Sequence, residues 1–204
     1  MGGRGTSSMA TLIAIAGGIN QGDYSEKLLN APWQHYENGN QVSVGATLSA
    51  AEAKIKGNDY ETGVLVDKDG FVVAAFRGGR SSVNFANTPV SDFKDATITH
   101  NHPTGSAFFS VADLATPAYY AMLGGKPRGM RATTKNNGTV SIVAVRQNAD
   151  WNKLVTAYNS AQKSIRKEWL NSGDITSIAS ASSYYQKWLY ENAPKYGFRF
   201  TVER

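Results

Sequence analysis

The sequence predicts a mixed α/β domain, in which helices flank a β-sheet, followed by a C-terminal helical hairpin. Three observations predict this class. Short β-branched runs are joined by turn-forming residues, and these runs alternate with helix-forming stretches. In the last quarter of the chain, apolar residues recur at helical spacing. We place an N-terminal extension at residues 1–40, the α/β domain at 41–147 and a helical extension with a terminal strand at 148–204.

The composition is that of an ordinary globular protein, with 204 residues, 41% hydrophobic and 18% charged. This length suits one domain with an appendage, or two small domains. Residues 1–8 are rich in glycine and serine, and we expect them to be disordered. The apolar segment 9–19 is too short to cross a bilayer, and we interpret it as a buried or partner-bound segment. We therefore expect a cytoplasmic protein without a membrane-spanning segment.

The first predicted elements are a helix and a hairpin. Residues 46–55 are rich in helix formers and are followed by Gly57 and Asn58, which end helices. Residues 61–66 and 71–76 are short apolar runs separated by a turn that contains Asp69 and Gly70. Their nearly continuous hydrophobicity predicts strands that are covered on both faces.

Three further elements complete the predicted domain. Residues 96–99 form a short strand that leads into His100, and residues 110–122 form a helix that ends before two glycines. Residues 128–134 and 139–145 form a second hairpin.

The C-terminal region predicts two amphipathic helices and a strand. Helical spacing of apolar residues covers 151–169 and 175–189, with Gly173 between them, and residues 196–203 alternate like a strand. We interpret Trp151, Trp169 and Trp188 as packing anchors of this helical hairpin.

The net charge of +5 is unevenly distributed. The stretch 126–147 contains five cations and no acidic residue, so it could face nucleic acid or an acidic protein surface. A solvated basic edge explains the same pattern equally well. No aromatic residue lies between these cations, so the base-stacking pattern of single-strand binders is absent there. The cations are Lys126, Arg128, Arg131, Lys135 and Arg146.

The strongest chemical signal is the segment 100–113, HNHPTGSAFFSVAD. Because the chain has no cysteine, imidazole, carboxylate or water would have to hold any metal. His100 and His102 are two residues apart on a predicted strand and face the same side. A turn and a helix then bring Asp113 back toward them, which gives two nitrogens, one oxygen and an open position, as in catalytic zinc sites.

Each part of this segment also has a purely structural interpretation. An exposed His-x-His pair without a ligand is common, and Ser110 followed by Asp113 three residues later is a variant of the helix capping box. Only the combination favours a metal site. His35 lies outside this segment among aromatic and polar residues, so we interpret it as a packed or surface histidine.

The segment resembles the signature of the JAMM (MPN+) metallopeptidases: His-x-His, seven residues, Ser, two residues, Asp. HNHPTG is also similar to the HNHPSG of RadC-type proteins of the same superfamily. The resemblance covers about residues 41–145 and implies an MPN/JAB-like, cytidine-deaminase-like fold of prokaryotic or phage type. The family also has a glutamate before an early strand, and Glu61 with the apolar run that follows resembles that element.

The resemblance implies a role for each residue. His100, His102 and Asp113 would bind one zinc ion per chain, Glu61 would transfer protons as the general base, and Ser110 would stabilise the oxyanion. An exposed carboxylate at a strand end is the structural alternative for Glu61. In that case Glu52, on a helix that looks exposed, is the fallback base.

The preferred function is therefore zinc-dependent hydrolysis of a peptide or isopeptide bond, in a peptide, a ubiquitin-like protein or a related carrier protein. One alternative is a RadC-like protein that binds nucleic acid through 126–147. Another is an inactive scaffold, which the intact set of five residues disfavours. In each case the helical extension could serve as a docking surface or an oligomerisation element.

Overall fold

The computed structural model describes residues 34–203, apart from 38–39, 45, 87 and 175–176. The predictions for residues 1–33 lie outside this range, as does the side chain of His35. The elements are β1 (Gln34–Glu37), β2 (Asn40–Val44), α3 (Leu48–Ile55), β3 (Thr62–Val66), β4 (Val72–Arg77), the 3-10 helix η1 (Val90–Phe93), β5 (Thr97–Asn101), α4 (Val111–Met122), β6 (Gly129–Thr133), β7 (Thr139–Ala144), α5 (Trp151–Asn171), α6 (Ile178–Asn192), the 3-10 helix η2 (Ala193–Tyr196) and β8 (Phe198–Glu203).

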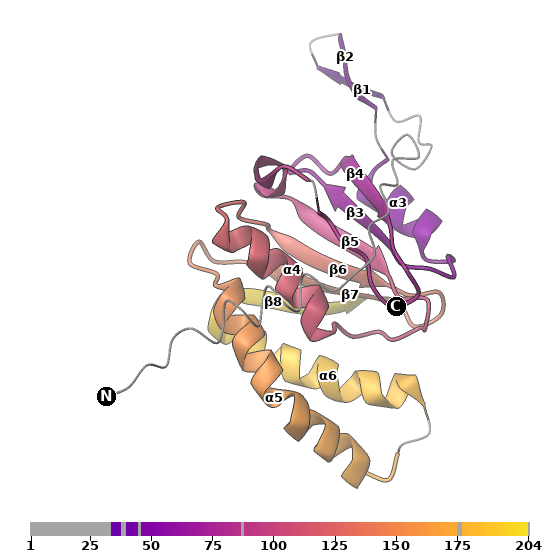
Figure 1. Ribbon diagram of the computed structural model, residues 1–204, viewed down its shortest axis with the longest axis vertical. Helices are drawn as coiled ribbons and strands as arrows, with labels where there is room; N and C mark the ends of the chain where they lie inside the picture. Colours follow the sequence, from indigo (N-terminus) through magenta and orange to yellow (C-terminus); the bar gives the residue numbers. More distant parts are fainter. Residues whose placement is uncertain (1–33, 38–39, 45, 87, 175–176, 204) are drawn as a thin grey trace.

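The predicted mixed α/β class is confirmed. Six strands form one sheet in the order β4-β3-β5-β6-β7-β8, and β1 and β2 form a separate hairpin (Figure 1). Each helix and strand predicted between residues 46 and 203 occurs within a few residues of its expected bounds. The β1–β2 hairpin and η1 were not predicted.

The parallel pair at the centre of the sheet positions the site. Within this sheet β5 and β6 run parallel, and the other neighbouring strands are antiparallel. A parallel pair needs a crossover connection, which α4 provides. The carboxyl end of β5, where the two histidines lie, therefore faces the loop that leads into α4.

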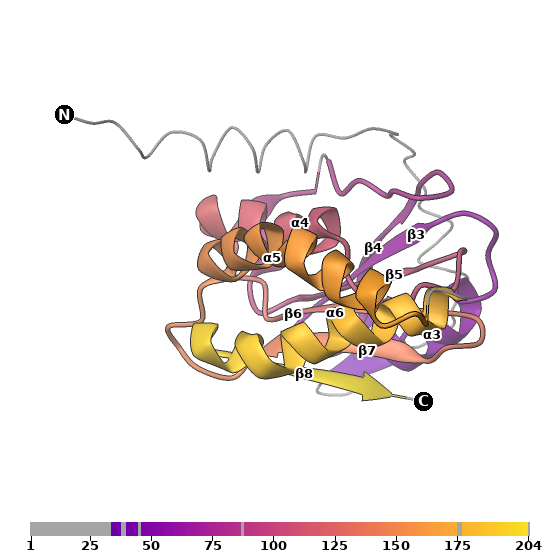
Figure 2. The same cartoon turned by 90° about the horizontal axis from the view of Figure 1, so that it is seen from below.

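The two faces of the sheet carry different helices, so the fold has two apolar cores. Val64 and Val66 pack with Ala51 and Ile55 of α3 on one face. The other face packs against α4 and α5, in a core that includes Leu65. Figure 2 shows α3 on the opposite side of the sheet from α4 and α5. Successive residues of β5 therefore face different helices.

Strand β4 departs from the prediction of strands covered on both faces. All five residues of β3 are buried, but β4 is an edge strand, and its Val73 and Arg77 are exposed. The apolar run predicted a strand correctly, but hydrophobicity alone did not distinguish a central strand from an edge.

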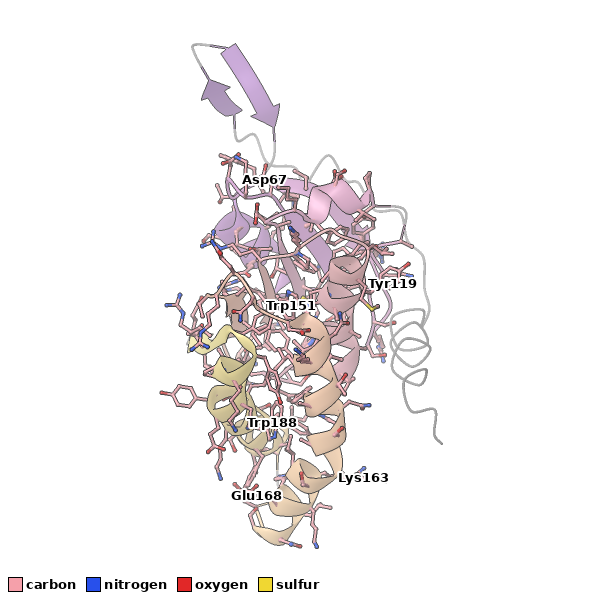
Figure 3. The ribbon with its side chains drawn as sticks, turned by 90° about the vertical axis from the view of Figure 1, so that its left-hand side faces the viewer. Asp67, Tyr119, Trp151, Lys163, Glu168 and Trp188 are labelled. Carbon is pink, nitrogen blue, oxygen red and sulfur yellow. The ribbon has the colours of Figure 1, made fainter. Side chains whose placement is uncertain are left out.

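The residues after 147 belong to the same sheet and core as the residues before them. β8 pairs with β7 along its whole length, and Leu154 and Tyr158 of α5 are fully buried beside α4 residues. The Trp151 indole donates to the Pro127 carbonyl at 3.0 Å. Figure 3 shows Trp151 on α5 and Trp188 on α6, with Lys163 on the exposed surface of α5. In packing, residues 148–203 are therefore continuous with the domain predicted at 41–147.

Candidate metal centre

The two histidines lie at the end of β5 and face the same side. His100 is the fourth residue of β5, and the backbone of His102 continues the ladder by donating to the Thr133 carbonyl at 2.9 Å. Strand geometry therefore extends through His102, and both imidazoles face the side of the sheet that carries α4. Their Nε2 atoms are 2.8 Å apart, and both side chains are buried.

Asp113 completes the cluster from the first turn of α4. Its Oδ1 is 3.2 Å from His100 Nε2 and its Oδ2 is 3.4 Å from His102 Nε2. One ligand atom from each of the three residues lies within 4.8 Å of the others. The predicted His-x-His and aspartate therefore come together as a group that could hold a metal ion.

The capping box that the sequence suggested is present, and it orients the Asp113 carboxylate. The Ser110 hydroxyl accepts from the Asp113 backbone N–H at 3.1 Å, and Asp113 Oδ2 accepts from the Ser110 backbone N–H at 2.6 Å. The structural and functional interpretations of these residues are thus compatible, because the cap holds the carboxylate where it faces the imidazoles.

A backbone hydrogen bond determines which nitrogen of His102 faces the cluster. The Nδ1–H of His102 donates to the Ser106 carbonyl at 2.6 Å. In a neutral imidazole this bond leaves the Nε2 lone pair available for a metal, an arrangement common among metal-binding histidines. The Nδ1 of His100, by contrast, is buried without a hydrogen-bond partner in the described part of the chain.

The electrostatics of the cluster favour positive charge beside Asp113. Burial opposes the charge on His102, but hydrogen bonding and proximity to Asp113 outweigh it and raise the pKa of His102 to about 9. Burial likewise opposes ionisation of Asp113, yet the neighbouring His100 and His102 hold the pKa of its carboxyl well below the usual range. The aspartate thus stays ionised, and positive charge is stabilised beside it.

Glu61 lies next to this cluster. The antiparallel register pairs Gly63 with His100, and continuing it by two residues places Glu61 opposite His102. Glu61 exchanges backbone hydrogen bonds with Gly78 and Gly79, and its side chain is buried. The pKa of the Glu61 carboxyl is raised, mainly because the group is buried, and the Asp113 charge adds to this effect. The nearby His100 and His102 lower the pKa but do not cancel the rise. The exposed strand-end carboxylate considered as the alternative is therefore not what the structure shows.

Asn101 is a residue of this region that sequence reasoning missed. Its side chain is buried, accepts from the Thr62 backbone N–H at 2.6 Å and donates to the Tyr60 carbonyl at 2.9 Å. It thereby fixes the segment that carries Glu61. The available signal was a polar asparagine between two histidines at the end of a predicted strand, a position where a buried side chain needs hydrogen-bond partners.

Glu52, the fallback base, lies on the other face of the sheet, and the expectation that its helix face is exposed was wrong. Its carboxylate accepts from Thr99 Oγ1 at 2.8 Å, and Arg131 donates to both of its oxygens at 2.7 and 3.0 Å. Because Thr99 and His100 are adjacent on one strand, Glu52 and the cluster are on opposite sides of the sheet. Glu52 therefore serves a structural ion pair, which Arg131 shares with Glu203.

The basic stretch 126–147 does not form one surface. Lys126, Arg128 and Arg146 line a depression at the amino end of β6, at the opposite end of the parallel strands from the histidines. Asp95 and Asp150 line it as well. Arg131, as described, is engaged in ion pairs.

No family model, no curated protein and no solved structure matches this chain. Among the described residues, no helix is long and apolar enough to cross a membrane. The spacing and geometry of the cluster are therefore the basis on which a function is assigned.

Proposed function

We propose that this chain is a zinc-dependent hydrolase of the JAMM/MPN type that cleaves a peptide or isopeptide bond. The observation that carries the proposal is the convergence of His100, His102 and Asp113 at the end of β5, with a buried carboxylate, Glu61, beside them. The His-x-His and Ser-x-x-Asp spacing supports the family, and the mixed sheet flanked by helices is compatible with its fold.

The donor set fits zinc. Two imidazole nitrogens and one carboxylate oxygen leave a coordination position open, as catalytic zinc sites do. The hydrogen bond from His102 to Ser106 is the outer-sphere contact that such a site needs. When bound, zinc would act as a Lewis acid and lower the pKa of a coordinated water.

The remaining chemistry comes from the residues of the chain. The Glu61 carboxylate would accept the proton of the attacking water and deliver it to the leaving amine. Its burial favours proton uptake, because burial raises the pKa of this group. The Ser110 hydroxyl uses a lone pair to cap α4, so its own hydrogen remains available to donate to the oxyanion of the substrate.

The metal site gives the first test. The purified protein is expected to carry about one zinc per chain and to lose it to a chelator, or in acid, where protons compete with the metal for its ligands. His100→Ala and Asp113→Ala should purify largely without metal, as determined by elemental analysis. His35→Ala is the matched control and should retain it. Full zinc content in both site variants would show that the metal lies elsewhere.

Ser110→Ala should affect both catalysis and stability. Loss of the hydroxyl is expected to lower the rate of hydrolysis by about 10²–10³-fold through lost oxyanion stabilisation. It should also lower the free energy of unfolding by about 1 kcal/mol, because α4 loses its cap. Ser177→Ala removes the equivalent cap of α6 and should change stability only. If Ser110→Ala loses stability but keeps its rate, Ser110 is a cap and nothing more.

A nucleic-acid-binding function is the second candidate. The depression lined by Lys126, Arg128 and Arg146 supports it. Asp95 and Asp150 offset part of that charge, which makes this the weaker candidate. Steeply salt-dependent binding to DNA in a protein that hydrolyses no peptide would favour it.

A further inference from the structure

The loop between His102 and α4 is held at consecutive carbonyl groups. The Ser106 carbonyl accepts from His102 Nδ1, as described above. The carbonyls on either side accept from side chains of distant elements: Gly105 from Asn137 Nδ2 at 2.6 Å, and Ala107 from Gln186 Nε2 at 2.5 Å. Asn137 lies in the turn between β6 and β7, and Gln186 lies on α6.

These two amides fix the peptide groups that flank the Ser106 carbonyl. A carbonyl oxygen reorients when the backbone dihedrals on either side of its peptide group rotate, and a rotation of one of them alone would move a neighbouring carbonyl out of its hydrogen bond. Two contacts farther along restrict the same loop: Tyr158 of α5 donates to the Phe109 carbonyl at 2.6 Å, and the Tyr185 ring stacks on Phe108 with a centroid separation of 4.5 Å.

We propose that Asn137 and Gln186 are positioning residues of the metal centre, which hold the Ser106 carbonyl where it orients His102 for the metal. The helical hairpin α5–α6 is thereby a part of the site, in addition to covering the sheet. This inference rests on the proposed metal centre and is independent of whether the centre hydrolyses peptides.

The location of the contacts supports this assignment. The Nδ1 of His102 is hydrogen-bonded to the loop, whereas the Nδ1 of His100 makes no hydrogen bond within the described residues. The orientation of His102 therefore depends on the loop more than that of His100 does. Loss of an outer-sphere contact to a ligand changes metal affinity by about 10–100-fold, and contacts one step farther out are expected to act at the lower end of that range.

Gln186→Met and Asn137→Ala test the proposal in the full chain. Gln186→Met keeps the length of the side chain but removes its donor, and Asn137→Ala removes the other donor. The readout is the dissociation constant for Co²⁺ and for Zn²⁺, measured by competition with a chromophoric chelator, together with the visible absorption of bound Co²⁺. Each variant should raise the dissociation constant about tenfold, and the Co²⁺ spectrum should change because one imidazole is less well oriented.

Matched controls separate positioning from stability. Gln147→Met removes the same amide at an exposed position on the far end of the sheet, and Asn136→Ala alters the same turn as Asn137. Both controls should bind metal like the wild type, and the metal-free melting temperatures of variants and controls should match. The proposal is overturned if Gln186→Met and Asn137→Ala bind metal as tightly as the wild type. It is also overturned if they bind metal more weakly only because the metal-free protein is less stable, as a lower melting temperature would show.

A wild type that binds no metal overturns this proposal and the proposed function together. One that binds metal tightly but hydrolyses nothing overturns only the hydrolase.

Discussion

Glu61→Gln should retain about one zinc per chain and a wild-type fold while losing hydrolysis by about 10²–10⁴-fold, the usual scale for a lost general base. The amide has the size of the carboxylate and can still form hydrogen bonds, but it cannot take up a proton at neutral pH. Metal content, circular dichroism and the rate on a peptide or isopeptide that the wild type cleaves are measured together. A loss of rate at full metal content assigns the effect to proton transfer rather than to coordination.

Glu52→Gln is the matched control, because it makes the same change to a buried carboxylate on the opposite face of the sheet. Hydrolysis should stay near the wild-type rate. The free energy of unfolding should fall by about 1.5–3 kcal/mol, because the guanidinium of Arg131 loses a charged hydrogen-bond partner. If Glu52→Gln is inactive and Glu61→Gln is fully active, the wrong carboxylate has been assigned. If neither substitution matters in an active enzyme, the proposed mechanism does not apply.

Removal of residues 148–204 should have the largest effect on folding. The truncation takes away β8, which pairs with β7, and α5, which buries one side of α4. The apolar surface this exposes is much larger than a soluble monomer tolerates, so the 1–147 fragment should aggregate on expression. Its solubility, size-exclusion profile and circular dichroism are the measurements.

A milder change tests the same interface in the full chain. Leu154 is fully buried, and Leu154→Ala should lower the free energy of unfolding by about 2–5 kcal/mol. Leu170→Ala, at a half-exposed position near the end of the same helix, should cost much less. A soluble, monodisperse 1–147 fragment would show that the tail is an independent unit joined by a linker.

Most of the secondary structure was predictable because its signals are local. The predicted turn at Asp69-Gly70 lies between β3 and β4, and the Ser110–Asp113 spacing located the start of α4 to the residue. The two histidines could be placed on one face for the same reason, since their spacing is a property of a single strand.

What the sequence did not reveal depends on partners that are distant along the chain. Glu52 looked exposed because its partner Arg131 is 79 residues away. The amides of Asn137 and Gln186 likewise look like ordinary surface residues, since nothing in their neighbourhood in the sequence marks the carbonyls they bind. Local sequence patterns also could not predict on which face of the sheet each helix packs. That placement puts Glu52 and Glu61 on opposite faces of the sheet.

The long sequence separation of the contact between Gln186 and Ala107 has a consequence for synthesis on the ribosome. The donor follows its acceptor by 79 residues. At about 5–20 residues per second, the histidines are translated several seconds before α6 exists. The nascent chain therefore contains the proposed metal ligands before it contains the helix that holds the neighbouring loop. If the centre binds zinc as proposed, an ion captured at that stage would be held by a loop that lacks these contacts and would exchange readily, and retention would become tight only when α6 docks. Metal content would then report whether the C-terminal part of an individual molecule has folded.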